Sequence, residues 1–140
     1  MASKRVLIVD DQAESRTLIR ELLGTAEYDL AEAGDGTERL VKAAEFRPDI
    51  ILLEVRMPGL DGYEVCLGLR ENPETKRIPV IFVTAVAGTA LNRRAFQAGA
   101  AACLTKPVRR EALVALIEAV LASAKPPAKP KAKGRAADEV

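Results

Sequence analysis

The chain has 140 residues, enough for one domain with a single hydrophobic core. Hydrophobic residues make up 49%, and no apolar stretch approaches the roughly 20 residues of a membrane span, so we expect a soluble, cytoplasmic protein. The net charge of +1 combines a mildly acidic body with a basic end, and the absence of histidine excludes histidine metal sites and His-based triads.

Short apolar runs alternate with segments of helical spacing along the chain. The predicted strands are, in order, 6–9, 28–33, 50–53, 80–83 and 101–105. Helices are predicted from the apolar residues of 18–23, 40–44, 63–69, 91–98 and 113–121, several of them ended by glycine or an Asn-Pro pair. The order is βα repeated five times, which predicts an α/β fold with a parallel sheet and helices on both faces.

The last part of the chain breaks this pattern. Residues 124–140 read AKPPAKPKAKGRAADEV, in which lysine, proline and alanine occur without periodic apolar residues. Such a segment cannot bury a core, so we expect a folded domain over 1–123 and a disordered tail over 124–140. Basic tails can contact nucleic acid, but this one has few charges and no aromatic residue, which favours plain solvation.

Polar residues follow the ends of four predicted strands. Asp10 and Asp11 follow the first strand, Glu54 follows the third, and Thr84 and Lys106 follow the fourth and fifth. Ligands of open parallel sheets bind outside the carboxyl ends of the strands, so three carboxylates would converge if the first and third strands are neighbours. Three like charges require a cation, and oxygen ligands favour Mg²⁺. The threonine and lysine would then contact an anion held by the metal.

Each of these residues also has a simpler explanation. The two aspartates suit caps of the helix that begins near Ala13, and Lys106 with Pro107 suits an ordinary turn. Their joint occurrence at four strand ends favours a site over these explanations. In the loop after the third strand, turn chemistry explains Gly59 and Gly62.

Four motifs carry a resemblance to a known family: VLIVDDQ (6–12), PDIILLEVRMPGLDGYE (48–64), IPVIFVTA (78–85) and FQAGAAACLTKPV (96–108). In this order they resemble the receiver domains of bacterial response regulators, over about residues 5–121. The resemblance implies a flavodoxin-like (βα)5 fold with strand order 2-1-3-4-5. It also implies a single-domain response regulator in two-component, phosphorelay signalling, which is not an enzyme beyond its own phosphorylation and dephosphorylation.

The resemblance also assigns roles to individual residues. It implies a Mg²⁺ site of Asp10, Asp11, the Glu54 side chain and the backbone carbonyl of Arg56, with Asp11 as a direct ligand. Thr84 would be the switch hydroxyl that turns toward a phosphoryl group. The family pairs that group with a lysine, here Lys106, and has a cis peptide bond between this lysine and the following proline.

The sequence departs from the family at the phosphoacceptor, which is an aspartate in the family and Glu54 here. The extra methylene moves the carboxylate outward by roughly 1.5 Å, and misplacement of this order costs about 10²-fold or more in rate. Glu54 can also reach Lys106 directly. We therefore expect weak or absent Mg²⁺ and a phosphorylation-independent pseudo-receiver: a mimic of the active state, a relic, or an engineered variant. Cys103 replaces a usual aromatic residue and, like Cys66, is expected to be a small hydrophobic residue.

The resemblance implies binding to a histidine kinase or downstream effector through the fourth helix, fifth strand and fifth helix. Arg93, Arg94, Arg109 and Arg110 lie in this region, although such a set is commonly only a solvated face. A homodimer is left open. The alternative functions are a Mg²⁺-dependent phosphatase or phosphotransferase, for which the short loops leave no room for a capping insertion, and nucleic-acid association through the tail.

Overall fold

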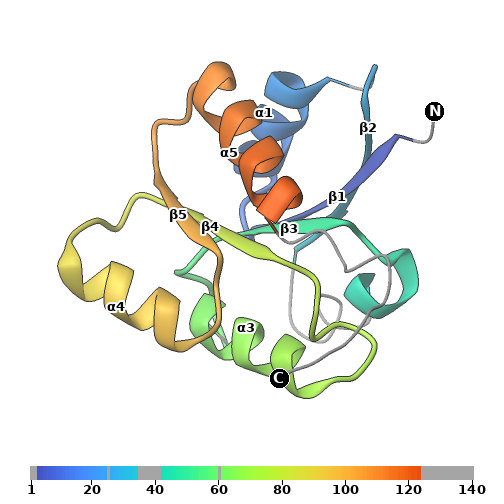
Figure 1. The fold of residues 1–140 in the computed structure, drawn as a ribbon. Helices are drawn as coiled ribbons and strands as arrows, with labels where there is room; N and C mark the ends of the chain where they lie inside the picture. The colour runs from blue at the N-terminus through green and yellow to red at the C-terminus, as the bar shows by residue number, and fades with distance from the viewer. Residues whose placement is uncertain (1–2, 25, 35–41, 60, 124–140) are drawn as a thin grey trace.

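The computed structural model describes residues 3–24, 26–34, 42–59 and 61–123 and is drawn in Figure 1. Residues 42–46 are helical, whereas residues 40 and 41 of the predicted second helix and the predicted tail over 124–140 lie outside the described residues. The remaining elements, in chain order, are β1 (Lys4–Val9), α1 (Ala13–Leu23), β2 (Tyr28–Ala33), β3 (Ile50–Leu53), α3 (Gly62–Glu71), β4 (Val80–Thr84), α4 (Thr89–Gln97), β5 (Ala102–Thr105) and α5 (Arg110–Ser123).

The strands form one parallel sheet in the order β2-β1-β3-β4-β5, which confirms the predicted topology. In the register of β1 against β3, Val9 is the partner of Leu53, so both strands end at the same level of the sheet. The backbone N–H of Glu54 donates to the carbonyl of Val9 over 2.9 Å. The residues that follow these two central strands are therefore neighbours.

Helices cover both faces of the sheet, as predicted (Figure 1). Along β1, Val6 and Ile8 pack into the cluster formed with α1 and α5, and Leu7 and Val9 pack into the opposite cluster with α3 and α4. Because side chains alternate between the two faces of a strand, only a strand covered on both faces needs apolar residues at every position. This explains the unbroken apolar runs of the central strands.

Two apolar residues of the predicted helix faces lie outside the core. Leu18 on α1 is 51% exposed and Leu67 on α3 is 48% exposed. In α1 the buried positions are Ile19 and Leu23, and in α3 the residue before Leu67, Cys66, is fully buried instead. Adjacent residues of a helix point about 100° apart, so a narrow contact with the sheet buries only one of the two.

Candidate functional site

The carboxyl ends of four strands bring together the polar residues that the sequence analysis singled out. Asp10 follows β1, Glu54 follows β3 and Thr84 is the last residue of β4; their exposed fractions are 3%, 8% and 0%. Lys106 follows β5 and is half-buried. Buried polar groups require partners, because an unpaired charge away from water is costly.

The ammonium group of Lys106 lies at the centre of this group. Its Nζ donates to Oε1 of Glu54 over 2.8 Å and to Oδ2 of Asp10 over 3.2 Å. A third bond, also 3.2 Å long, goes to the hydroxyl of Ser15 on α1. The lysine therefore links the ends of β1 and β3 from its place after β5. The expectation that Glu54 can reach Lys106 directly is confirmed.

The second carboxylate oxygen of Glu54 is bound to the backbone that follows it. Oε2 accepts the N–H of Val55 at 2.8 Å and the N–H of Arg56 at 3.1 Å. The side chain thus turns toward its own loop. Both oxygens of Glu54 therefore accept hydrogen bonds from protein donors, which hold the carboxylate in this orientation.

Both partners of the ion pair are charged at neutral pH. Burial raises the pKa of Glu54, but interactions with the side chains of Lys106 and Thr84 and with the Arg56 backbone outweigh it, and the net pKa is lowered. For Lys106, burial lowers the pKa. The hydrogen bond to Glu54 and the charge of Asp10 raise it by more than burial lowers it, so the net pKa is raised. The two opposite shifts are those of a carboxylate and an ammonium that stabilise each other.

The two aspartates after β1 differ in their surroundings. Asp10 uses its other oxygen, Oδ1, to accept the N–H of Gln12 at 2.9 Å. The N-cap of α1 is Gln12, without a side-chain capping bond, so the alternative explanation of the pair as helix caps is wrong. Asp11 is half-buried, and its side chain has no hydrogen-bond or ion-pair partner in the part of the chain that the structure describes.

The donor set suits Mg²⁺ in its chemistry, since all candidate ligands are oxygens. The arrangement does not fit the ion, because the ammonium of Lys106 lies between the Asp10 and Glu54 carboxylates that a cation would join. Among the described residues, no three or more His, Cys, Asp or Glu side chains are grouped so that they could hold a metal ion. In this arrangement Lys106 supplies the positive charge.

We expect Mg²⁺ to bind weakly, because it must displace Lys106 from two carboxylates. Binding to the native state alone would raise its stability by about 1.4 kcal/mol at roughly ten times Kd, seen as a modest rise of the thermal midpoint at millimolar Mg²⁺. The Asp11→Ala variant is expected to lose this rise and to be slightly more stable without metal, because one of the mutually repelling carboxylates is removed. The Asp29→Ala control, at the opposite end of the sheet, should keep the rise. A full response in Asp11→Ala would contradict the assignment of Asp11.

The loop between β3 and α3 is held against the site by a close backbone approach. A Cβ on Gly62 would lie 2.3 Å from the carbonyl oxygen of Glu54, and the Gly62 N–H donates to the Val55 carbonyl over 2.7 Å. Turn chemistry does explain Gly59, whose φ is 77°, but the reason for Gly62 is this lack of space. The sequence analysis also missed the capping box of Asp61 and Glu64, whose Asp-x-x-Glu spacing was a readable signal.

Neither cysteine belongs to the site. Cys66 is fully buried in the cluster under α3 and α4, and its thiol donates to the carbonyl of Ala98 over 3.2 Å. Cys103 is half-buried on β5 and packs against the same cluster. Burial raises the pKa of both thiols, which keeps them protonated. Both are small hydrophobic residues, as predicted. The peptide bond between Lys106 and Pro107 is cis, as the resemblance implied.

Comparison with known proteins places this geometry in a family. Residues 6–118 match the profile of the response regulator receiver domain. The response regulator PleD of Caulobacter vibrioides is 42% identical over 106 residues, and the polar-differentiation response regulator DivK of Brucella anthropi is 35% identical over 121 residues. The chain belongs to the response regulator receiver family: it is a receiver domain of two-component signalling.

The matched segment makes up a different share of the length of each relative. The match covers 76% of this chain but only 23% of PleD, whereas it covers 86% of this chain and 98% of DivK. The chain therefore spans about a quarter of the length of PleD and nearly the whole length of DivK.

Solved structures confirm the fold. The chemotaxis protein CheY4 of Vibrio cholerae superimposes with a TM-score of 0.80 at 31% identity, covering 85% of this chain and 99% of that protein. The receiver domain of the sensor histidine kinase PA1611 from Pseudomonas aeruginosa gives 0.78 at 30% identity, covering 86% and 99%, and was solved with a magnesium ion coordinated in its active-site cleft. Within the described residues of our chain, no helix has the length and apolar character needed to cross a membrane.

Proposed function

We propose that this receiver signals without phosphorylation, with Glu54 in the place of the phosphoacceptor aspartate. The observation that carries the proposal is the 2.8 Å ion pair between Lys106 Nζ and Glu54 Oε1. By resemblance, Lys106 is the cation that pairs with a bound phosphoryl group. Here a carboxylate already pairs with it, so the lysine has an internal partner in the absence of a phosphoryl group, and Mg²⁺, which would have to displace that lysine, is at most a weak ligand.

The output we propose is a protein–protein interaction through α4, β5 and α5. The strand β5 is at one edge of the sheet, with α4 on one face and α5 on the other (Figure 1). On α4, Phe96 is 80% exposed, and Arg93 is also exposed. Arg109 and Arg110 are exposed at the start of α5. An exposed aromatic side chain among arginines is the composition that protein interfaces favour. A histidine kinase or effector is the proposed partner, and a second copy of the chain is the alternative.

A phosphoryl mimic tests the proposed state directly. We expect beryllium trifluoride with Mg²⁺ to leave the backbone amide resonances of α4 and β5 unchanged in the wild-type protein, because Lys106 is already paired with Glu54. In the Glu54→Asp variant the shorter carboxylate releases Lys106, and the same addition should shift those resonances. The measurement is a pair of proton–nitrogen correlation spectra for each protein.

The Glu71→Asp variant is the matched control, since it shortens an exposed glutamate at the end of α3. It should behave like the wild-type protein in both spectra. If the wild-type resonances shift as far as those of Glu54→Asp, the receiver responds to a phosphoryl-like ligand and the proposal is wrong.

A further inference from the structure

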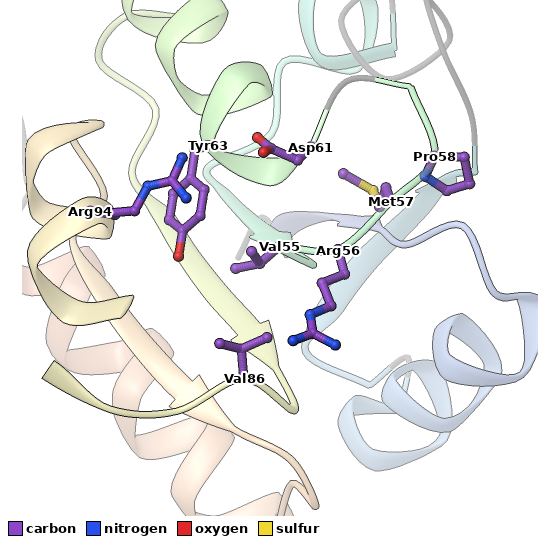
Figure 2. Close-up of a pocket in the computed structure, with 8 residues that line it drawn as sticks. All are labelled: Val55, Arg56, Met57, Pro58, Asp61, Tyr63, Val86 and Arg94. Atoms are coloured by element: carbon purple, nitrogen blue, oxygen red, sulfur yellow. The ribbon is translucent and has the colours of Figure 1, made fainter. Parts of the chain in front are cut away.

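A pocket of about 590 Å³ opens beside the ion-paired site (Figure 2). It lies between the loop after β3, the start of α3, α4 and the segment after β4. Its volume falls within the range of small-molecule sites, about 300–1,000 Å³. Asp10, Glu54 and Lys106 do not line it, so it is a separate cavity from the ion-paired site.

The inner wall of the pocket is apolar. Val55 and Met57 are buried at 5% and 8% exposure, and Val86 is half-buried at the opposite wall. Tyr63 adds a buried aromatic ring, which meets Phe82 edge-on at 5.4 Å between ring centroids. Because these side chains are held by the core behind them, the wall is preformed and would gain contact with an apolar ligand without rearrangement.

Two arginines give the pocket a positive charge. The guanidinium of Arg94 lies over the ring of Tyr63, 3.9 Å from its centroid, and the Arg56 side chain extends away from this pair toward Val86 (Figure 2). In the described part of the chain neither guanidinium has an ion-pair partner. Among the described residues that line the pocket, one is acidic: Asp61, which accepts the Glu64 N–H over 3.0 Å as the N-cap of α3.

We propose that this pocket binds a small molecule in which a planar apolar ring carries one anionic group, a carboxylate or a phosphate. The anionic group pairs with Arg56, because a guanidinium matches either group with two parallel hydrogen bonds. The ring packs on Val55 and Val86 and against the face of Arg94 that is turned away from Tyr63, since guanidinium planes stack on flat rings. This site is independent of whether Glu54 accepts a phosphoryl group.

Two probes distinguish the sources of this chemistry: adenosine monophosphate for a nucleotide and naphthoate for an aromatic carboxylic acid. We expect at least one to shift the methyl resonances of Val55 and Val86. The probe that binds should do so about tenfold or more tightly than inorganic phosphate. If that probe is adenosine monophosphate, it should also bind more tightly than adenosine, which lacks the phosphate. The probe that binds identifies the source. The proposal is overturned if neither probe shifts these resonances at millimolar concentration, or if phosphate binds as tightly as the probe.

Charge-matched variants show whether binding is at this pocket. Arg56→Ala is expected to weaken probe binding by about tenfold or more, because the paired anion loses its charged donor. Arg93→Ala removes the same charge from an exposed residue of α4 that does not line the pocket, and should leave the affinity unchanged. Val86→Trp, which fills the cavity, should abolish binding. An equal loss in both arginine variants would indicate attraction to the overall charge and would overturn the proposal.

Discussion

Incubation with acetyl phosphate and Mg²⁺ is expected to add no phosphoryl group to the wild-type protein and to phosphorylate the Glu54→Asp variant. In the wild type both carboxylate oxygens are occupied, one by Lys106 and one by the N–H groups of Val55 and Arg56. In-line attack also tolerates little displacement of the nucleophile, and an error of about 1 Å can cost on the order of 10²-fold in rate. Intact-protein mass spectrometry over time measures the difference.

The restored transfer in Glu54→Asp depends on groups that the chain still has. Asp11, Thr84 and Lys106 remain in this variant. The substitution therefore restores an aspartate at the acceptor position and, at the same time, removes the ion pair between Glu54 and Lys106. The Glu71→Asp control, which makes the same shortening on an exposed surface, should gain no phosphoryl mass. A stoichiometric, base-labile adduct on Glu54 of the wild-type protein would show that the longer side chain does reach the donor.

The Lys106→Met variant is expected to lose about 2–3 kcal/mol of stability toward unfolding. Methionine fills a similar volume, but Asp10 and Glu54, with side chains 4% and 10% exposed, would face each other without a cation. Removing one partner of a fully buried ion pair costs about 3–5 kcal/mol, and we expect less because the Lys106 side chain is 25% exposed. Urea denaturation measures the change, and the thermal midpoint should fall by roughly 10 °C.

Three further measurements separate the ion pair from a general effect of losing charge. The Lys76→Met control removes an exposed lysine and should change stability by less than about 0.5 kcal/mol. Combining Lys106→Met with Glu54→Gln should cost less than the sum of the single variants, because one of the two unpaired carboxylates is gone. Mg²⁺ should stabilise Lys106→Met more than the wild type, since no ammonium competes for the carboxylates. Strict additivity together with an unchanged Mg²⁺ response would contradict the central role of Lys106.

Most of the fold could be predicted because the sheet is covered on both faces. The runs 50–53 and 80–83 are apolar without alternation, and only a doubly covered parallel strand requires this pattern. The start of β1 was missed, because Lys4 and Arg5 lie at the exposed end of the strand, where hydrophobicity gives no signal. The strand order was not derivable from periodicity at all and was implied by the resemblance.

The candidate site was predictable in its members but not in its contacts. Parallel strands end at a common edge, so residues after β1, β3, β4 and β5 had to lie close together. The turn of the Glu54 side chain toward Lys106 depends on competing partners in three dimensions, which a sequence does not contain. Ser15, which completes the bonds of Lys106, is a plain helical serine in the sequence. The pocket was also missed, since its wall combines residues from four separate segments.

The stacking of Arg94 on Tyr63 makes the protein's own fluorescence a reporter. The chain has no tryptophan and two tyrosines, which lie on opposite faces of the sheet: Tyr28 with α1 and α5, and Tyr63 with α3 and α4. In a Tyr28→Phe variant all tyrosine emission would come from the ring under Arg94. A ligand in the pocket or a displacement of α4 could then be followed optically, without attaching a dye to either cysteine.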